Sequence, residues 1–201
     1  MTLPDAQKIK VKSLTRKYDG FFKIDELIFD HPTFKGEMIE NVRREVFVRL
    51  DAVAVLPYDP VHDTVLLTRQ LRIASAGKME SPWIVELIAG LVDKTDEAFV
   101  NVAEREALEE AGLNISNLTP ICDFFPSVGG SNEKLYLFLA LTDLSQAGGY
   151  FGLAEEHEDI EAFVVSREQA MDMIFDGEIQ TASTIIALQW LQLNHHRYQR
   201  K

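Results

Sequence analysis

The sequence has little of several features that would assign it to a class at once. It contains a single cysteine, Cys122, so no disulfide can form within the chain, and this usage is typical of a reducing cytosol. No apolar run approaches the length of a membrane span, and the first twenty residues lack the apolar core of a signal peptide. We therefore expect a cytoplasmic protein that does not contact a membrane.

Positive charge is also scarce. Lys and Arg number 20 against 32 Asp and Glu residues, which gives a formal net charge of −12 at pH 7. Such a chain repels nucleic acid at long range, and no segment reads as a basic groove, so we expect no nucleic-acid partner. An acidic enzyme acting on a phosphorylated substrate would need local arginines or bound cations beside the phosphates.

The 201 residues are enough for one domain with an extension. Residues 1–48 contain runs of near period two, separated by Gly20, Pro32 and Gly36, which predicts an antiparallel β-sheet. Such a sheet is too small to stand alone, so we expect it to pack on something else, for example a second subunit. Residues 49–201 mix strands with three helices, which is typical of an α/β/α sandwich of the α+β class.

Three segments have helical signals. The clearest is Asp96–Ala111, with Asp96 as its N-cap and Gly112 as its stop. Residues 166–169 are expected to cap a short helix that runs through Met173, and residues 181–196 form the last helix.

The first of these helices has an acidic face. Glu106, Glu109 and Glu110 fall within about 100° of arc, so their charges repel unless something neutralises them. Divalent cations held by carboxylate oxygens would do so, and Arg105 could pair with Glu109 four residues later. The helix taken alone is more typical of an ordinary solvated surface. A stripe of small apolar residues would let it pack closely on a sheet: Val100, Ala103, Ala107 and Ala111.

The whole segment from Gly90 to Leu113 resembles the Nudix box, the signature of a family that hydrolyses nucleoside diphosphates linked to other moieties. The family pattern is G-x5-E-x7-R-E-U-x-E-E-x-G-U, where U is aliphatic. From Glu97 onward the match is complete if Ala107 counts as U. One departure is that six residues, not five, separate Gly90 from Glu97, in a loop that precedes the helix.

The resemblance implies a metal site. Glu106 and Glu110 would be direct ligands, and Glu109 would be a ligand or lie close to the metal. Arg105 would orient the glutamates, and the carbonyl of Ala89 could add an oxygen. The expected cofactor is Mg²⁺, with Mn²⁺ as a substitute, which would neutralise the diphosphate and activate a water.

A resemblance to bacterial ADP-ribose pyrophosphatases extends over most of the chain, including GLAEEHEDI, VVSREQA and IIALQWLQL. It implies that a mobile loop carries the catalytic base, Glu156, and a further metal ligand, Glu158. Glu155 and His157 remain alternatives for these roles. The residues alone allow an equally simple interpretation, in which this acidic stretch is a solvated loop.

Substrate contacts are expected from arginines and a glycine turn. Arg43 and Arg44 point to opposite faces of a strand, so at most one faces a given phosphate. The resemblance favours Arg72 and one of that pair. Phe21 and Phe22 could stack on adenine, although strand phenylalanines are more often core residues.

The turn Ser127-Val128-Gly129-Gly130 stands where this group typically carries Ser-Pro-Gly-Gly, and it keeps both glycines, so Ser127, Gly129 and Gly130 are expected at the substrate.

The function implied is Mg²⁺-dependent hydrolysis of ADP-ribose to AMP and ribose 5-phosphate, by a homodimer with exchanged N-terminal sheets. A Nudix enzyme acting on another nucleotide sugar, such as GDP-mannose, is the first alternative. A noncatalytic ADP-ribose sensor is the second, and it is disfavoured because the box glutamates are intact and no helix-turn-helix follows.

Overall fold

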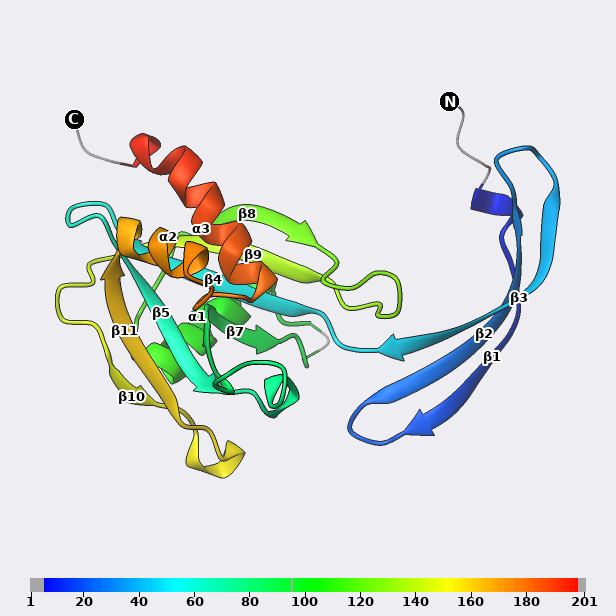
Figure 1. Cartoon of the computed structure of the whole chain (residues 1–201), viewed down its shortest axis with the longest axis horizontal. Helices are drawn as coiled ribbons and strands as arrows, with labels where there is room; N and C mark the ends of the chain where they lie inside the picture. The colour runs from blue at the N-terminus through cyan, green and yellow to red at the C-terminus, as the bar shows by residue number, and fades with distance from the viewer. Residues whose placement is uncertain (1–5, 95, 199–201) are drawn as a thin grey trace. The chain divides into compact units, whose positions relative to one another are not determined.

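A computed structural model describes residues 6–94 and 96–198, which divide into two compact units (Figure 1). The first unit contains the residues up to Leu50 together with Phe125–Glu133. The second contains Asp51–Phe124 and the residues from Lys134 onward. No helix in the ranges that the structure describes is long and apolar enough to cross a membrane.

The first unit is a three-stranded antiparallel sheet, which confirms the N-terminal sheet expected from the sequence. A short 3-10 helix, η1 (Ala6–Lys8), precedes β1 (Lys10–Asp19), β2 (Lys23–Pro32) and β3 (Met38–Val48). The segment Phe125–Glu133 joins this unit through Phe47, whose backbone amide donates to the carbonyl of Gly130 at 2.7 Å.

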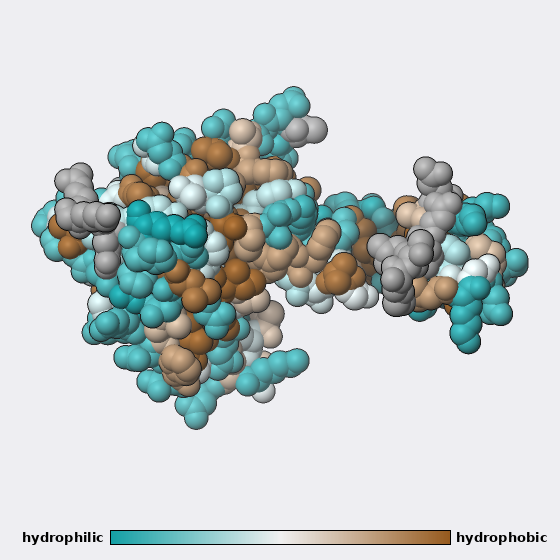
Figure 2. All heavy atoms as spheres, turned by 90° about the horizontal axis from the view of Figure 1, so that it is seen from above, coloured by the Kyte–Doolittle hydropathy of each residue, from teal (hydrophilic) through white to brown (hydrophobic). Residues whose placement is uncertain are grey.

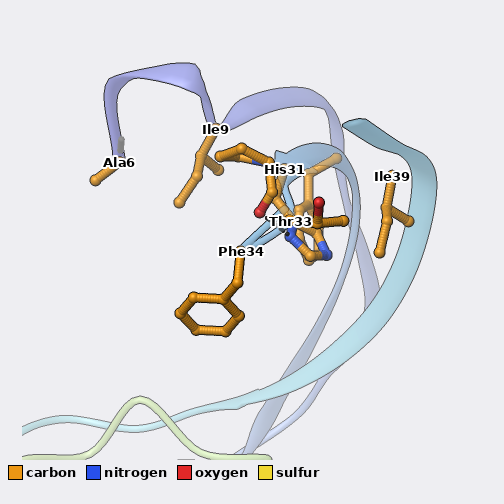
Figure 3. A pocket seen from close by; sticks show the side chains of 8 residues that line it. Ala6, Ile9, His31, Thr33, Phe34 and Ile39 are labelled. Carbon is orange, nitrogen blue, oxygen red and sulfur yellow. Dashed lines mark hydrogen bonds between the residues drawn. The ribbon is translucent and has the colours of Figure 1, made fainter. Parts of the chain in front are cut away.

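This sheet leaves much apolar surface uncovered. Every residue of β1 is exposed, and Figure 2 shows hydrophobic atoms at the surface among hydrophilic ones. The exposed large apolar residues of η1 to β3 include Ile9, Val11, Leu14, Tyr18, Phe34, Met38 and Ile39. An apolar cavity of about 520 Å³ lies among Ala6, Ile9, Phe29, His31, Pro32, Thr33, Phe34 and Ile39 (Figure 3).

The second unit is built on one mixed sheet, in the order β10-β11-β5-β4-β9-β8, with β6 on β5 and β7 on β4. The pair β4–β9 is parallel and the other pairs are antiparallel. The strands are β4 (Ala52–Asp59), β5 (Thr64–Leu71), β6 (Trp83–Glu86), β7 (Ile88–Leu91), β8 (Thr119–Phe124), β9 (Leu135–Leu141), β10 (Gly149–Phe151) and β11 (Ile160–Ser166). The 3-10 helices of this unit are η2 (Ile73–Ser75), η3 (Ala154–Glu156) and η4 (His195–Arg197).

Its three helices are α1 (Phe99–Ala111), α2 (Arg167–Phe175) and α3 (Ala182–Asn194). Helix α1 begins three residues later than predicted, with Ala98 as its N-cap, so the expected capping by Asp96 is wrong. The predicted cap of α2 is confirmed, because Ser166 and Gln169 form a capping box.

The strand β4 separates two apolar layers because successive strand residues face opposite sides. Ala54, Leu56 and Tyr58 pack in the layer that includes α2 and α3. Val53 and Val55 pack in the layer that includes α1. Helices therefore cover both faces of the sheet, which confirms the predicted α/β/α sandwich.

Candidate functional site

The acidic face of α1 does not lie in solvent. Glu110 is 3% exposed, and its carboxylate accepts a hydrogen bond from the backbone amide of Ala89 at 3.1 Å. The side chain of Glu106 is 13% exposed. The interpretation of this helix as an ordinary solvated surface is therefore wrong for these two carboxylates.

The helix packs on the sheet through small residues, as expected, but not with the predicted set. Val100 is 37% exposed, and Val102 takes its place in the buried stripe. The buried stripe of α1 is Val102, Ala103, Ala107 and Ala111.

Gly90 in β7 makes the close approach of α1 possible. A Cβ atom at this position would overlap the side chain of Glu106. Any larger residue would therefore push Glu106 away from the strand.

Helix α1 stops at Gly112, which adopts φ 63°. The backbone amide of Gly112 donates to the carbonyl of Leu108 at 3.0 Å.

The backbone of Ala89 offers a carbonyl oxygen on the same side as these carboxylates. In an antiparallel pair, the amide and carbonyl of one residue point to the same side of the strand. The amide of Ala89 is bonded to Glu110, so both groups point away from β4. Carboxylate and carbonyl oxygens are the ligands that Mg²⁺ and Ca²⁺ prefer, so this donor set fits a hard divalent cation.

Arg105 links the glutamates of the motif. Its guanidinium lies 2.9 Å from Glu106 and 2.9 Å from Glu109, so the predicted pair with Glu109 is present. A carboxylate oxygen of Glu97 lies 3.9 Å from the Nε of the same side chain. The extra residue between Gly90 and Glu97 therefore leaves Glu97 in contact with Arg105.

Burial leaves two carboxylates short of positive charge. It raises the pKa of Glu106 to about 7, although the Arg105 charge opposes this. It also raises the pKa of Glu110 to about 8, against the hydrogen bond from Ala89. The charge of Glu158 adds to both shifts. A bound cation would supply the missing compensation.

Two glycine contacts hold the loop that carries Glu158. The ring of Phe151 lies against Gly112, at the end of α1. Gly152 has φ 109°, and a Cβ there would lie 2.8 Å from the carbonyl oxygen of Glu158. Only glycine accommodates this path, which fixes the backbone of the loop where it passes Glu158.

The other candidates on the acidic loop are Glu156, Glu155 and His157. Glu156 is the last residue of η3, and its side chain lies outside the described part of the chain. Glu155 is exposed, and His157 has a left-handed backbone with φ 56°.

Arg72 is the arginine candidate of the second unit. It directly precedes η2, and its Nε donates to the carboxylate of Glu86 at 2.8 Å. Its charge lowers the pKa of Glu110, in opposition to burial. The second unit thus holds these candidates on α1, β7, the β5–β6 hairpin and the loop before β11: Ala89, Arg105, Glu106, Glu109, Glu110, Glu158 and Arg72.

The remaining arginine candidates lie in the first unit. Arg43 and Arg44 are adjacent exposed residues of β3, and Arg43 forms an ion pair with Glu26. Arg44 donates to the carbonyl of Arg43 at 2.8 Å.

The aromatic and turn candidates also lie in the first unit. Phe22 is 44% exposed and contacts the ring of Phe47 edge-on at 4.9 Å, with Arg49 over it. Residues 127–130 form an exposed turn in which the amide of Gly130 donates to the carbonyl of Ser127 at 3.1 Å.

One group of metal-binding residue types was not foreseen. Ligand atoms of Asp59, His62 and Asp143 lie within 4.8 Å of one another, where the turn between β4 and β5 meets the segment after β9. The Asp59 carboxylate already accepts from His62 Nδ1 at 2.7 Å and from the amides of Val61, His62 and Leu144. These bonds use its lone pairs, so the group fastens the turn.

The chain is similar to a known protein family and to several named proteins. The NUDIX domain family matches residues 48–188. The chain is 46% identical over 178 residues to the ADP-ribose pyrophosphatase of Escherichia coli (strain K12), covering 89% of this chain and 85% of that protein. It is 42% identical over 196 residues to the ADP-ribose pyrophosphatase of Haemophilus influenzae, covering 96% and 90%. It is 34% identical over 178 residues to a GDP-mannose pyrophosphatase of Escherichia coli O1:K1 / APEC, covering 88% and 91%.

The contact between Gly90 and Glu106 gives a first prediction. The variant Gly90→Ala should lower kcat by about 10²-fold, because displacement of a positioned group by about 1 Å costs that much. Steady-state kinetics with saturating Mg²⁺ measures it. Gly177→Ala is the control, because its φ of 77° imposes backbone strain on alanine while the atom nearest to the added Cβ is 3.8 Å away, so it reports general destabilisation without a clash. Equal kcat in the Gly90→Ala variant and the wild type would contradict the prediction.

The raised pKa values give a second prediction. Between pH 4.5 and about 8, Glu106 and Glu110 stay protonated in the folded protein without metal but lose their protons in the unfolded protein. The contribution of these protons to the free energy of unfolding is therefore lost as pH rises through about 7 to 8. Cations bind the deprotonated carboxylates, so the rise in Tm caused by Mg²⁺ should grow from about pH 6 to about pH 8.5. Thermal unfolding with and without Mg²⁺ measures it. A Mg²⁺ effect independent of pH would be the contrary result.

Proposed function

The chain belongs to the Nudix family of hydrolases, and from this premise we propose that it hydrolyses the diphosphate of ADP-ribose to AMP and ribose 5-phosphate with Mg²⁺. The observation that carries the proposal is the pair of buried, undercompensated carboxylates, Glu106 and Glu110, beside the carbonyl of Ala89. The names of two relatives at 46% and 42% identity favour ADP-ribose as the substrate.

Five groups would hold the metal: the carbonyl of Ala89 and the carboxylates of Glu106, Glu109, Glu110 and Glu158. Mg²⁺ there, or Mn²⁺ in its place, would offset the diphosphate charge and lower the pKa of a water. Arg105 holds Glu106 and Glu109 in fixed orientation, since its guanidinium bridges them at 2.9 Å. We assign this work to residues 49–201.

Glu156 is our candidate for the base that takes a proton from the attacking water. Its position two residues before Glu158 supports this, because Glu158 is held near the metal carboxylates by the loop. Glu155 and His157 are the alternatives on the same loop.

Substrate binding is assigned to arginines and to the first unit. Arg72 would contact a phosphate, since it already acts on the charge of Glu110. Arg43 or Arg44, with Phe22 and the turn of Ser127, Gly129 and Gly130, would contact the nucleoside or the terminal ribose. Arginine suits phosphate because its planar fork binds two oxygens at once.

A panel of nucleotide sugars tests the assigned substrate. We expect kcat/KM for ADP-ribose to exceed that for GDP-mannose by about 10²-fold or more, the discrimination available to a site that hydrogen-bonds its substrate. Phosphate release after phosphatase treatment of the products measures it. Preference for GDP-mannose, the substrate named for the relative at 34% identity, would replace the first assignment with the second.

Variants of the carboxylates proposed to hold the metal are the control for the panel. Glu106→Gln and Glu110→Gln should each lower kcat on every substrate, because each removes a charged ligand. Binding of ADP-ribose without turnover by the wild type would instead favour the noncatalytic sensor. Glu156→Gln should lower kcat while leaving Mg²⁺ binding intact.

We also infer that residues 1–48 form a homodimer interface with exchanged N-terminal sheets. The exposed apolar residues of β1 and the cavity at this sheet support it, since patches of this kind mark interfaces. The mass of the wild type measured by sedimentation should be twice the 22.8 kDa of one chain. The double variant Val11→Lys/Leu14→Lys should have the mass of a single chain. Val61→Lys, at an exposed apolar residue of the second unit, is the control. A wild-type monomer at high concentration would refute the dimer.

A further inference from the structure

Glu86 is a partly buried carboxylate close to the candidate site that has no part in the Nudix motif. Its side chain is 18% exposed, and one oxygen accepts from the Nε of Arg72 at 2.8 Å. Arg72 itself is 48% exposed. An ion pair with a half-exposed partner contributes little to stability, so stability alone does not account for Glu86.

The strand register explains how Arg72 reaches this partner. Glu86 in β6 lies opposite Thr68 in β5, while Arg72 stands four residues after Thr68 on the same face. The backbone at Arg72 is extended, and its amide donates to the carbonyl of Pro82 at 2.8 Å. The Arg72 side chain therefore runs back along the hairpin, and Glu86 determines where its guanidinium stops.

The bond to Glu86 uses only one edge of the guanidinium. Within residues 6–94 and 96–198, the two terminal nitrogens of Arg72 have no hydrogen bond or ion pair. A guanidinium held at Nε still presents four N–H donors on those nitrogens. Two of them in parallel match two oxygens of a phosphate.

Glu86 also competes with the metal carboxylates for Arg72. Glu86 stands three residues before Ala89, whose amide is bonded to the buried carboxylate of Glu110, so without Glu86 the guanidinium would be drawn toward that carboxylate. An arginine paired with Glu110 would occupy the place of a cation. Glu86 therefore keeps Arg72 close to the acidic cluster but separate from it.

We propose that Glu86 is a positioning residue, which orients Arg72 toward the substrate diphosphate and keeps it off the metal carboxylates. The proposal rests on the function proposed above. It predicts that Glu86 acts only through Arg72.

A double-mutant cycle tests this. Wild type, Arg72→Ala, Glu86→Ala and the double variant are compared for kcat, KM and the Mg²⁺ concentration of half activation. Glu86→Ala should lower kcat/KM about tenfold and raise the Mg²⁺ requirement, by misplacing a group that contacts the phosphates. In the Arg72→Ala background the same change should alter kcat/KM less than about twofold, since interacting residues are not additive.

Two further variants separate positioning from general effects. Glu86→Gln keeps an oxygen acceptor for Nε, so its kcat/KM should return to within about threefold of the wild type. Glu161→Ala is the matched control, because it removes one of the two carboxylate partners of Arg69, 2.7 Å away on the neighbouring strand β11 and outside the site, the other being Glu178. Its kinetics should equal those of the wild type.

The outcomes separate the two proposals. Equal losses from Glu86→Ala with and without Arg72 would overturn the positioning role, and so would a silent Glu86→Ala beside a damaging Arg72→Ala. Wild-type failure to hydrolyse any nucleotide sugar would instead overturn the proposed function. In that case the same four proteins are compared for their affinity for inorganic pyrophosphate with Mg²⁺, measured by calorimetry. If the losses of binding free energy from Glu86→Ala and Arg72→Ala add up in the double variant, the role of Glu86 is refuted.

Discussion

The burial of the Glu110 carboxylate against the backbone of β7 is the contact on which the candidate site depends. It brings α1 so close to the strand that only glycine fits at residue 90, opposite Glu106. It turns the amide and carbonyl of Ala89 toward the helix rather than toward β4. Desolvation then leaves both glutamates with raised pKa values. A divalent cation would offset the resulting shortage of positive charge, which is why the proposed metal site is placed here.

The rest of the second unit serves this contact from three directions. Arg105 bridges neighbouring glutamates from within α1. The loop after β10 is fixed by the ring of Phe151 on Gly112 and by the close approach of Gly152 to Glu158, whose charge adds to the raised pKa values of Glu106 and Glu110. The β5–β6 hairpin supplies the ion pair of Arg72 and Glu86. Glycines allow the close approaches, and ion pairs fix the charged side chains in place. Together they keep polar groups where a protein interior would otherwise contain apolar side chains.

The sequence predicted the second unit well because its signals are local. Periodicity indicated the strands and helices, and the spacing of acids in α1 placed the carboxylates on one face of that helix. The start of α1 was misjudged because Asp96 has the right residue type for a cap, whereas the chain enters the helix at Ala98 without a side-chain cap. Val100 was misplaced for a related reason: the helix begins later and presents Val102 to the sheet. Glu86 carried no signal, since a lone glutamate in an apolar strand predicts no partner.

The sequence by itself determined the chemistry of the motif, because residue type and offset along a helix place carboxylates on one face whatever surrounds them. The tertiary structure alone decided that this face is buried, that Glu97 still reaches Arg105 across a loop with one extra residue, and that Glu86 holds Arg72. It also grouped Phe125–Glu133 with the N-terminal sheet. Each of these depends on segments distant along the chain meeting in space, and burial and charge coupling arise only there.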